Sequence, residues 1–204
     1  KPLTQDHSWA GYHSAMGTGS GNDKVNRWDG TTIGDQLGTA WQNDPFQTEH
    51  VITFGNQTGQ NQDTVPHIMY CWAKTPGLIG IGSYGGNGDD NGPNVIIDDG
   101  AFGFRPAFVY TKRIGHNSGD WWITDSTRTT FNTMSKAIYI DNQAEEDAND
   151  NRIDFTANGF KLRDDSARRN AGGTSGVNIY MYLAFAEEPF QGVTGVDIAQ
   201  SRAL

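Results

Sequence analysis

The chain has 204 residues, 19% of them charged, and carries a formal net charge of −9 at pH 7. This length gives one large domain or two small ones, and a hydrophobic core can form without disulfides. The acidic balance argues against nucleic acid as a partner and disfavours anionic membrane surfaces, because phosphate contacts need clustered Lys and Arg. No apolar run approaches the ~20 residues that span a bilayer, so we expect no membrane insertion.

Ten segments show the alternation, or the short apolar runs between Gly, Asn and Asp clusters, that are typical of β-strands. They are residues 50–54, 67–73, 78–83, 94–97, 107–112, 120–124, 136–140, 152–155, 159–163 and 177–186. Only 35–42 and 143–149 could form short helices, and neither has an apolar stripe. Many short strands with almost no helix predict an all-β fold, an antiparallel β-sandwich or jelly-roll-like structure with long Gly/Asn/Asp loops.

Three stretches are predicted to lie outside the strands. Residues 22–47 show little periodicity, so we expect long loops draped over the sheet, with Trp28 and Trp41 as anchors. Residues 85–93 and 164–176 lack apolar anchors and are predicted to be exposed linkers.

The two halves of the chain repeat a series of landmarks in one order. The echoes are Ser8-Trp9-Ala10-Gly11 with Asp120-Trp121-Trp122-Ile123, Ile52-Thr53-Phe54 with Ile153-Asp154-Phe155, and Cys71-Trp72-Ala73-Lys74 with Ala184-Phe185-Ala186-Glu187. We therefore predict two related β modules, residues 1–100 and 101–192, and a C-terminal arm, residues 193–204, in one compact unit. The strand expected before Trp9 would fall ahead of residue 1, so the first module is predicted to lack it.

The repeat assigns Trp9, Trp72, Trp121 and Phe185 to core packing, since the same position is filled in both halves. The single cysteine, Cys71, excludes an intrachain disulfide and is predicted to be a buried, inert thiol because it lies in an apolar run.

Several patterns resemble reactive motifs without completing them. Gly80-Ile81-Gly82-Ser83-Tyr84-Gly85 matches a dinucleotide fingerprint, but the acidic Gly-rich stretch after it cannot start the required helix. We interpret it as a strand that leads into a loop. The five histidines show no zinc spacing, and no Gly-x-Ser-x-Gly is present. A dispersed triad or a carboxylate pair has no local signature, and both alternatives stay open.

Oxygen-rich pairs give weak candidates for a calcium site. Asp98 and Asp99 could contribute ligands, since Ca²⁺ takes 6–8 oxygens. The stretch that begins at Asp147 starts like an EF-hand loop, but Arg152 occupies its glycine position and Asn158 its glutamate position. The default expectation is that no cofactor is bound.

The two halves do not share the region from Gly82 to Asp99, and there we expect ligand binding. Its candidate contacts are Tyr84, Asn87, Asp89, Asp90 and Asn91. Trp122 is a further candidate, because its neighbour Trp121 is assigned to the core and adjacent strand residues face opposite sides. Trp122 lies either under a loop or exposed as a ligand contact, and the first alternative is favoured.

Six motifs occur in one order: Tyr70-Cys71-Trp72-Ala73, Gly82-Ser83-Tyr84-Gly85-Gly86-Asn87-Gly88, Gly103-Phe104-Arg105-Pro106-Ala107-Phe108-Val109, Trp121-Trp122-Ile123-Thr124-Asp125-Ser126, Asp154-Phe155-Thr156-Ala157-Asn158-Gly159-Phe160-Lys161-Leu162-Arg163 and Ala184-Phe185-Ala186-Glu187-Glu188-Pro189-Phe190. The series resembles a domain of unknown function common in tail-associated proteins of marine bacteriophages. The resemblance covers residues 65–192 strongly and the opening segment more loosely. Lys74 stands where that family more often has Glu. The resemblance implies no catalytic residues.

This resemblance implies a non-enzymatic virion protein, a tail fibre, spike or receptor-binding module that contacts a host-surface glycan or protein. Expected partners are other virion proteins and the chain itself, as a homotrimer by analogy with phage fibres. One alternative is a capsid-decoration or fibre-shaft assembly element. A second is a polysaccharide depolymerase, which would need two carboxylates in a groove.

Overall fold

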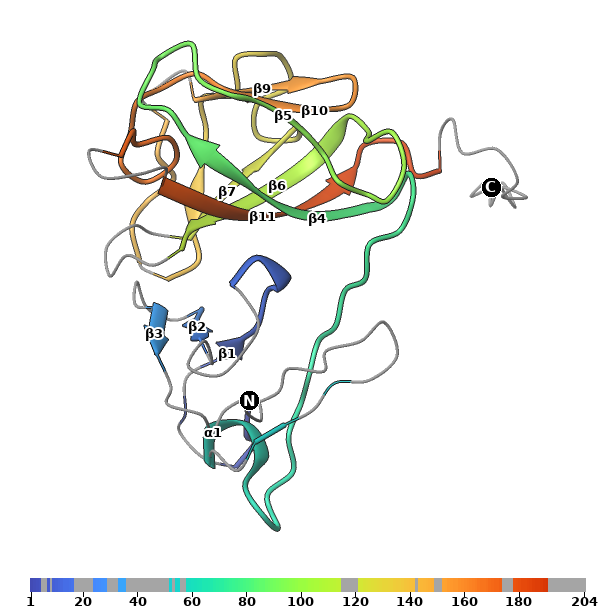
Figure 1. The fold of residues 1–204 in the computed structure, drawn as a ribbon, viewed down its shortest axis with the longest axis vertical. Helices are drawn as coiled ribbons and strands as arrows, with labels where there is room; N and C mark the ends of the chain where they lie inside the picture. Colours follow the sequence, from blue (N-terminus) through green and yellow to red (C-terminus); the bar gives the residue numbers. More distant parts are fainter. Residues whose placement is uncertain are drawn as a thin grey trace.

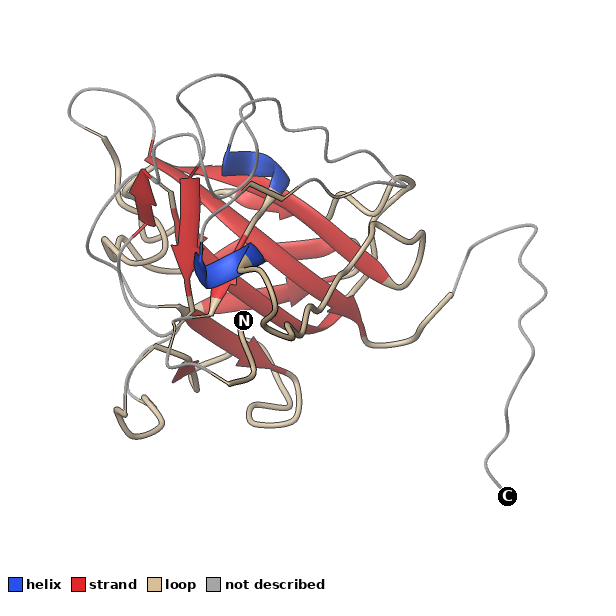
Figure 2. Cartoon of the chain, turned by 90° about the horizontal axis from the view of Figure 1, so that it is seen from below, coloured by secondary structure: helices blue, strands red, loops and turns tan. Residues whose placement is uncertain are grey.

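The computed structural model describes residues 1–4, 7, 9–16, 24–28, 33–35, 52, 54–55, 58–114, 121–141, 143–148, 152–173 and 178–190. Its elements are β1 (Ala10–Gly11), the 3₁₀-helix η1 (Ser14–Met16), β2 (Lys24–Arg27), β3 (Ile33–Asp35), α1 (Thr58–Asn61), β4 (Ile79–Gly86), β5 (Asn94–Ile96), β6 (Pro106–Arg113), β7 (Trp122–Asp125), β8 (Ile138–Tyr139), β9 (Ile153–Thr156), β10 (Gly159–Leu162) and β11 (Asn178–Ala186) (Figure 1). Strands dominate and every strand pair is antiparallel (Figure 2). The prediction of an all-β antiparallel sandwich is confirmed. No described helix is long and apolar enough to cross a membrane.

The larger sheet has five strands in the order β4-β11-β6-β7-β8. β11, the last strand among the described residues, lies between β4 and β6 and pairs along nearly its whole length with both. Its side chains alternate between two hydrophobic clusters: Tyr180, Tyr182 and Ala184 enter one, while Met181 and Leu183 enter the other. The sheet is therefore buried on both faces, as the long apolar run in this strand indicates.

One face of the five-stranded sheet packs against the three-stranded sheet β5-β10-β9. The core between them takes Val95, Ile153, Phe155, Phe160 and Leu162 from the smaller sheet, and Ile97 from the residue directly after it. The rings of Tyr84 and Tyr182 meet that of Phe160 edge-on, with centroids 5.7 and 5.5 Å apart. These edge-to-face contacts fix how the two sheets face each other.

The opposite face of the large sheet is covered by the N-terminal segments, which lie below it in Figure 1. Met16 of η1 is buried there. The ring of Trp28 lies 6.0 Å from that of Tyr110 and 6.1 Å from that of Trp121, which stack on each other at 5.0 Å. Trp28 is thus an anchor against the sheet, as expected; Trp41 lies outside the described residues.

Two glycines of β4 explain the fingerprint-like motif at 80–85. A Cβ on Gly82 would lie 2.6 Å from the Tyr182 hydroxyl oxygen, and one on Gly80 would lie 2.0 Å from Ile97 Cγ2. Both positions are glycine because the Tyr182 ring and the Ile97 side chain, from the residue directly after β5, occupy the space where side chains would project. The motif is therefore a packing feature of the strand interior and not a nucleotide site.

Eight of the ten predicted strands correspond to observed ones, from β4 onward, with shifts of one or two residues at most ends. The segment 67–73 is not a strand; only His67 forms an isolated bridge, to Pro2. Of 50–54, Ile52 and Phe54 are described and lie outside strands, and the rest falls outside the described residues. No helix forms over 143–148, and Asp35, the start of the other expected helix, belongs to β3, with 36–42 outside the described residues.

Other expectations need correction. Residues 24–27 and 33–35, predicted as loops, form β2 and β3. Cys71 is exposed, not buried, because its apolar segment joins no sheet. Arg169 and Asn170, in the linker predicted to be exposed, are buried.

The two halves of the sequence echo differ in local structure. Trp121 is fully buried, whereas Trp72 is 39% exposed and Trp9 is only partly buried, so the predicted core role holds for one indole and fails for Trp72. Phe185 is partly buried against the second cluster. β4 and β5, from the predicted first module, pair with β11 and β10 from the second. The boundary expected after residue 100 therefore falls inside one hydrogen-bonded unit.

His13 ties the N-terminal segments to the central strand. Its Nδ1 accepts a hydrogen bond from the Ala15 backbone N–H at 3.0 Å, so Nε2 must carry the proton that it donates to the Tyr182 carbonyl, also at 3.0 Å. Burial lowers the pKa of His13, and the Lys74 charge lowers it further, while the Tyr182 carbonyl opposes the shift. These two hydrogen bonds of His13 therefore require a neutral imidazole.

We predict that the contribution of the His13 hydrogen bonds to stability decreases at acidic pH. The unfolded chain binds a proton at His13 near pH 6.5 and the folded chain only at lower pH, so the free energy of unfolding falls as the pH drops below about 6.5. His13→Gln retains an amide donor and should remove this part of the pH dependence in urea denaturation at pH 7.5 and 5. His67→Gln serves as control and should follow the parent chain. Parallel pH profiles for His13→Gln and the parent would contradict the assignment.

Candidate functional site

Two loops meet at one end of the sandwich, residues 87–93 after β4 and residues 164–173 after β10. Asn170 joins them. Its buried Nδ2 lies 2.8 to 3.0 Å from Asn87 Oδ1 and from the carbonyls of Asp89 and Asp164, and its Oδ1 accepts the Asn87 backbone N–H at 2.9 Å. Because a single buried amide makes all four contacts, it fixes the loops relative to each other.

The second loop is also held from beneath. The Arg169 guanidinium binds the Asp164 carboxylate through Nε, at 2.8 Å, and Nη2, and lies over the Trp122 ring at 4.8 Å. The Tyr84 hydroxyl donates to the Arg169 carbonyl at 2.8 Å. Arg169, Trp122 and Tyr84 are all buried. The loop is thus held in place by the cation–π contact between Arg169 and Trp122 and by the hydrogen bond from the Tyr84 hydroxyl.

This arrangement corrects two predicted ligand contacts. Trp122 has no exposed surface, so the favoured alternative, a ring under a loop, is the correct one. Tyr84 is buried between Phe160 and Tyr180 and uses its hydroxyl on the loop backbone. Both aromatic rings support the loops from inside and present little or no surface to a ligand.

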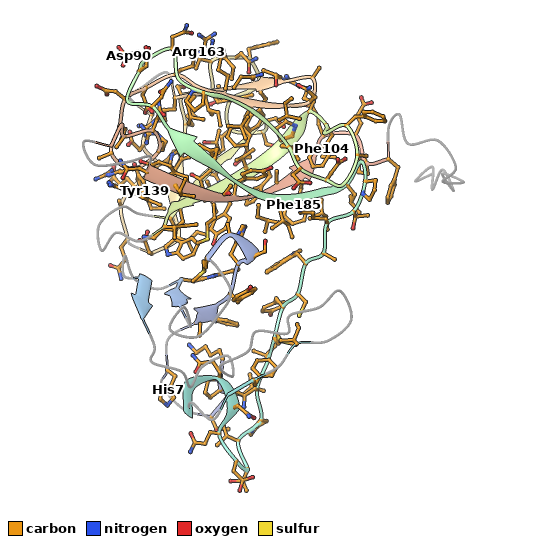
Figure 3. The ribbon with its side chains drawn as sticks, in the orientation of Figure 1. His7, Asp90, Phe104, Tyr139, Arg163 and Phe185 are labelled. Atoms are coloured by element: carbon orange, nitrogen blue, oxygen red, sulfur yellow. The ribbon has the colours of Figure 1, made fainter. Side chains whose placement is uncertain are left out.

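A hollow of about 500 Å³ lies over these loops and the adjoining ends of the sheets. Its lining is formed almost entirely by charged side chains: Asp90, Asp147, Arg152, Arg163, Asp164, Asp165, Ser166, Arg168 and Arg169. Figure 3 places Asp90 and Arg163 together at this end of the molecule. Four arginines face four aspartates, so the formal charge of the lining is balanced even though the chain is acidic.

Ion pairs and hydrogen bonds set the positions of the arginines. Nη2 of buried Arg152 lies 2.5 Å from Asp147 Oδ1. Arg163 holds both Nε and Nη2 at 2.6 Å from Asp154 Oδ2 and donates to Asn91 Oδ1 at 3.1 Å. These contacts limit the rotamer freedom of the guanidinium groups before any ligand arrives.

Arg168 is the exposed arginine of the hollow. It donates to the Tyr139 hydroxyl at 3.2 Å and stacks over that ring at 5.5 Å. The hollow therefore offers planar donors and acceptors in fixed directions, which suits a ligand rich in hydroxyl or carboxylate oxygens.

Four of the predicted contacts belong to the first loop. Asp90 lines the hollow, and Asn91 reaches it through Arg163. Asn87 Oδ1 accepts the Asp89 backbone N–H, and Asp89 Oδ1 that of Asn91, so these side chains shape the loop. The sequence patterns do not identify the arginines of the hollow, because these residues are scattered between 152 and 169. The adjacent pair Arg168-Arg169 in an acidic chain is the feature that could have indicated them.

Both side chains that were weighed as calcium ligands have partners within the protein. Asp99 is buried, and its carboxylate accepts the backbone N–H groups of Gly77, Ala101 and Gly103 at 2.8 to 3.1 Å. Burial opposes the charged form of Asp99, but these donors outweigh it and lower the pKa of the carboxyl. Asp98 is exposed and pairs with Lys74 Nζ at 2.5 Å. No group of three or more His, Cys, Asp or Glu side chains that could hold a metal occurs in the described part of the chain.

We predict that Asp99→Asn destabilises the fold by about 2 kcal/mol, since it weakens hydrogen bonds to a buried charge. Asp98→Asn is the matched control and should cost less than about 1 kcal/mol, because its ion pair is exposed. Chemical denaturation with calcium and with chelator checks both values. A calcium-dependent gain in stability that Asp99→Asn abolishes would restore the calcium hypothesis.

The fold and this surface define an all-β sandwich protein with a charged hollow built on paired loops. Over residues 1–189 the chain matches the model of a family described as a domain of unknown function, DUF7483, and it belongs to that family. Neither a curated protein nor a solved structure matches the chain.

Proposed function

We propose that the chain is a non-enzymatic structural module of a phage particle, of the tail-fibre, spike or receptor-binding type, and that its charged hollow contacts a host-surface glycan. The observation that carries the proposal is the hollow itself, with its arginines and aspartates already oriented on clamped loops. The motif series between Tyr70 and Phe190 supports a position on the virion surface, beside other virion proteins.

A glycan fits the chemistry of the lining. Sugars present many hydroxyl groups in fixed directions, and hydrogen bonds from such groups to guanidinium or carboxylate are charge-assisted and therefore stronger than neutral ones. Because Asn170, Asp164 and Asp154 fix the loops and arginines beforehand, little conformational entropy remains to be lost on binding. Loops carried on a rigid β scaffold are a common location for recognition sites.

A second candidate function is assembly within the particle, by capsid decoration or as a fibre shaft. Two exposed phenylalanines favour it: Phe102 is 87% exposed and Phe131 is 80% exposed. Phe102 lies in the loop that Asp99 holds, and Phe131 precedes Asn132, whose side chain binds both the N–H and the carbonyl of Phe155. Aromatic residues, Phe among them, are enriched in protein–protein interfaces, so these rings are available for contacts within a particle.

The polysaccharide depolymerase is the weaker alternative on chemical grounds. A glycosidase needs one carboxylic acid free to protonate the leaving oxygen and a second to act as base or nucleophile. In the hollow, Asp147 and Asp164 are each held by a buried arginine. Only Asp90 and Asp165 are left for such a pair among the lining carboxylates, and reducing-end release by the intact chain would reveal it.

Arg168→Ala tests the glycan proposal. The substitution removes an exposed donor from the hollow, and we expect at least a tenfold loss of binding to an array of neutral and acidic bacterial surface polysaccharides. Arg128→Ala removes the same charge from an exposed pair with Asp125 and Glu146 outside the hollow lining, and should bind as the parent does. Equal binding by both variants, or an array without signal for the parent chain, would contradict the proposal.

A further inference from the structure

The segment 67–75, termed the strap, connects the N-terminal segments to β4 and runs as a long extended connection in Figure 1. It is fixed at both ends. Ile68 exchanges two hydrogen bonds with Lys1, at 2.9 and 3.0 Å, and Thr75 bonds the Ile79 carbonyl at 2.9 Å. Between these points, the backbone from Met69 to Lys74 makes no backbone–backbone hydrogen bond with the described part of the chain.

The side chains of the strap are exposed on both sides. Met69 is 53% exposed and Tyr70 is 59% exposed, and Cys71 and Ala73 are exposed as well. Tyr70 stacks on Trp72 at 6.4 Å, and Trp72 stacks on Trp28 at 5.9 Å, so these rings connect the strap to the aromatic cluster under the large sheet. Apart from the Ala73 carbonyl, which accepts the Thr75 hydroxyl at 3.2 Å, the backbone from Met69 to Lys74 has no hydrogen-bond partner among the described residues, and such an extended apolar segment is a template for strand pairing.

Sequence and structure disagree here in a specific way. The run Ile68-Met69-Tyr70-Cys71-Trp72 has the composition of a strand, yet beyond the bonds of Ile68 to Lys1 it forms no strand pair with the described residues. Pro66 and Pro76 bound the strap and limit any pairing to the residues between them. Because no described residue pairs with this short, bounded segment, its backbone is available to a strand of another molecule.

Charge points to a second copy of the chain as that partner. The net charge of −9 opposes the association of two copies, yet residues 64–88 contain no Asp or Glu. The one charged side chain of the strap, Lys74, is neutralised by Asp98. The strap is thus a region where two copies can approach without like-charge repulsion.

We propose that the strap forms an antiparallel pair with the strap of a second copy, centred on Cys71. This register is self-complementary, as a two-fold interface requires. It places Tyr70 opposite Trp72 of the second copy, twice, and Met69 opposite Ala73, twice. Tyr70 and Trp72 then form cross-strand aromatic pairs on one side, while Cys71 meets its own copy on the other. The pairing is independent of what the hollow binds.

The single cysteine tests the register directly. Residues directly opposite in an antiparallel pair have Cα atoms about 4.5 or 5.5 Å apart, within the range that a disulfide bridges. Diamide should therefore convert the full chain to a covalent dimer within minutes. The control is Ala157→Cys in a Cys71→Ser background, which moves the thiol to an exposed hairpin turn and should give little dimer. Equal cross-linking of both proteins, or none at Cys71, would overturn the proposal.

A charge swap tests the pairing without oxidation. Met69→Asp with Ala73→Asp places like charges opposite each other twice, and sedimentation velocity should show a monomer at concentrations where the parent is a dimer. Met69→Lys with Ala73→Asp carries an equal number of new charges but opposes unlike ones, and should restore the dimer. A parent chain that is monomeric or trimeric, or a dimer that both variants leave intact, would refute the antiparallel register.

Discussion

The alternating burial of β11 is the constraint on which the rest of the structure depends. This strand lies between β4 and β6, and its even-numbered and odd-numbered side chains belong to two different hydrophobic clusters. A shift of one residue in its register would exchange Tyr182 for Leu183 in the sandwich core. The sandwich and the N-terminal covering therefore share one strand, and neither keeps its packing if that strand moves.

The loops of the candidate site depend on the same strand. The Tyr180 hydroxyl accepts the Ala171 N–H at 2.9 Å and donates to the Ala167 carbonyl at 3.0 Å. Two residues along, the Tyr182 hydroxyl accepts the Asp98 N–H at 2.7 Å. Burial raises the pKa of both phenols, so they stay neutral donors and acceptors at physiological pH. The hydroxyl groups of these core tyrosines thus fix the positions of loops that carry charged side chains, and those positions depend on the register of β11.

The sequence predicted secondary structure best where the pattern of apolar and polar residues within one segment is sufficient to identify a strand. Local alternation located most strands from β4 onward, including β6, β10 and β11. It failed for the strap, because an apolar extended segment reads as a strand whether or not a partner is available. It also missed β2 and β3, whose pairing depends on neighbours and not on periodicity.

The candidate site was predicted in part. The loop with Asp90 and Asn91 stood out as acidic and Gly-rich, and it lies beside the hollow. The arginines that complete the hollow come from the residue directly before β9 and from the segment after β10, and only the fold brings them together. The exposure of Trp122 could not be decided from the sequence, since a cation from the other loop covers its ring. Long-range side-chain contacts of this kind leave no local pattern.

Native-state amide hydrogen exchange tests the central role of β11 most directly. If this strand supports both clusters, the amides of Tyr182 and Leu183 should be the slowest to exchange. Their opening free energy should equal that for global unfolding by denaturant. The amides of β9 and β10 should exchange no more slowly than these. Exchange of β11 through a lower-energy opening, while β9 and β10 stay protected, would contradict the account.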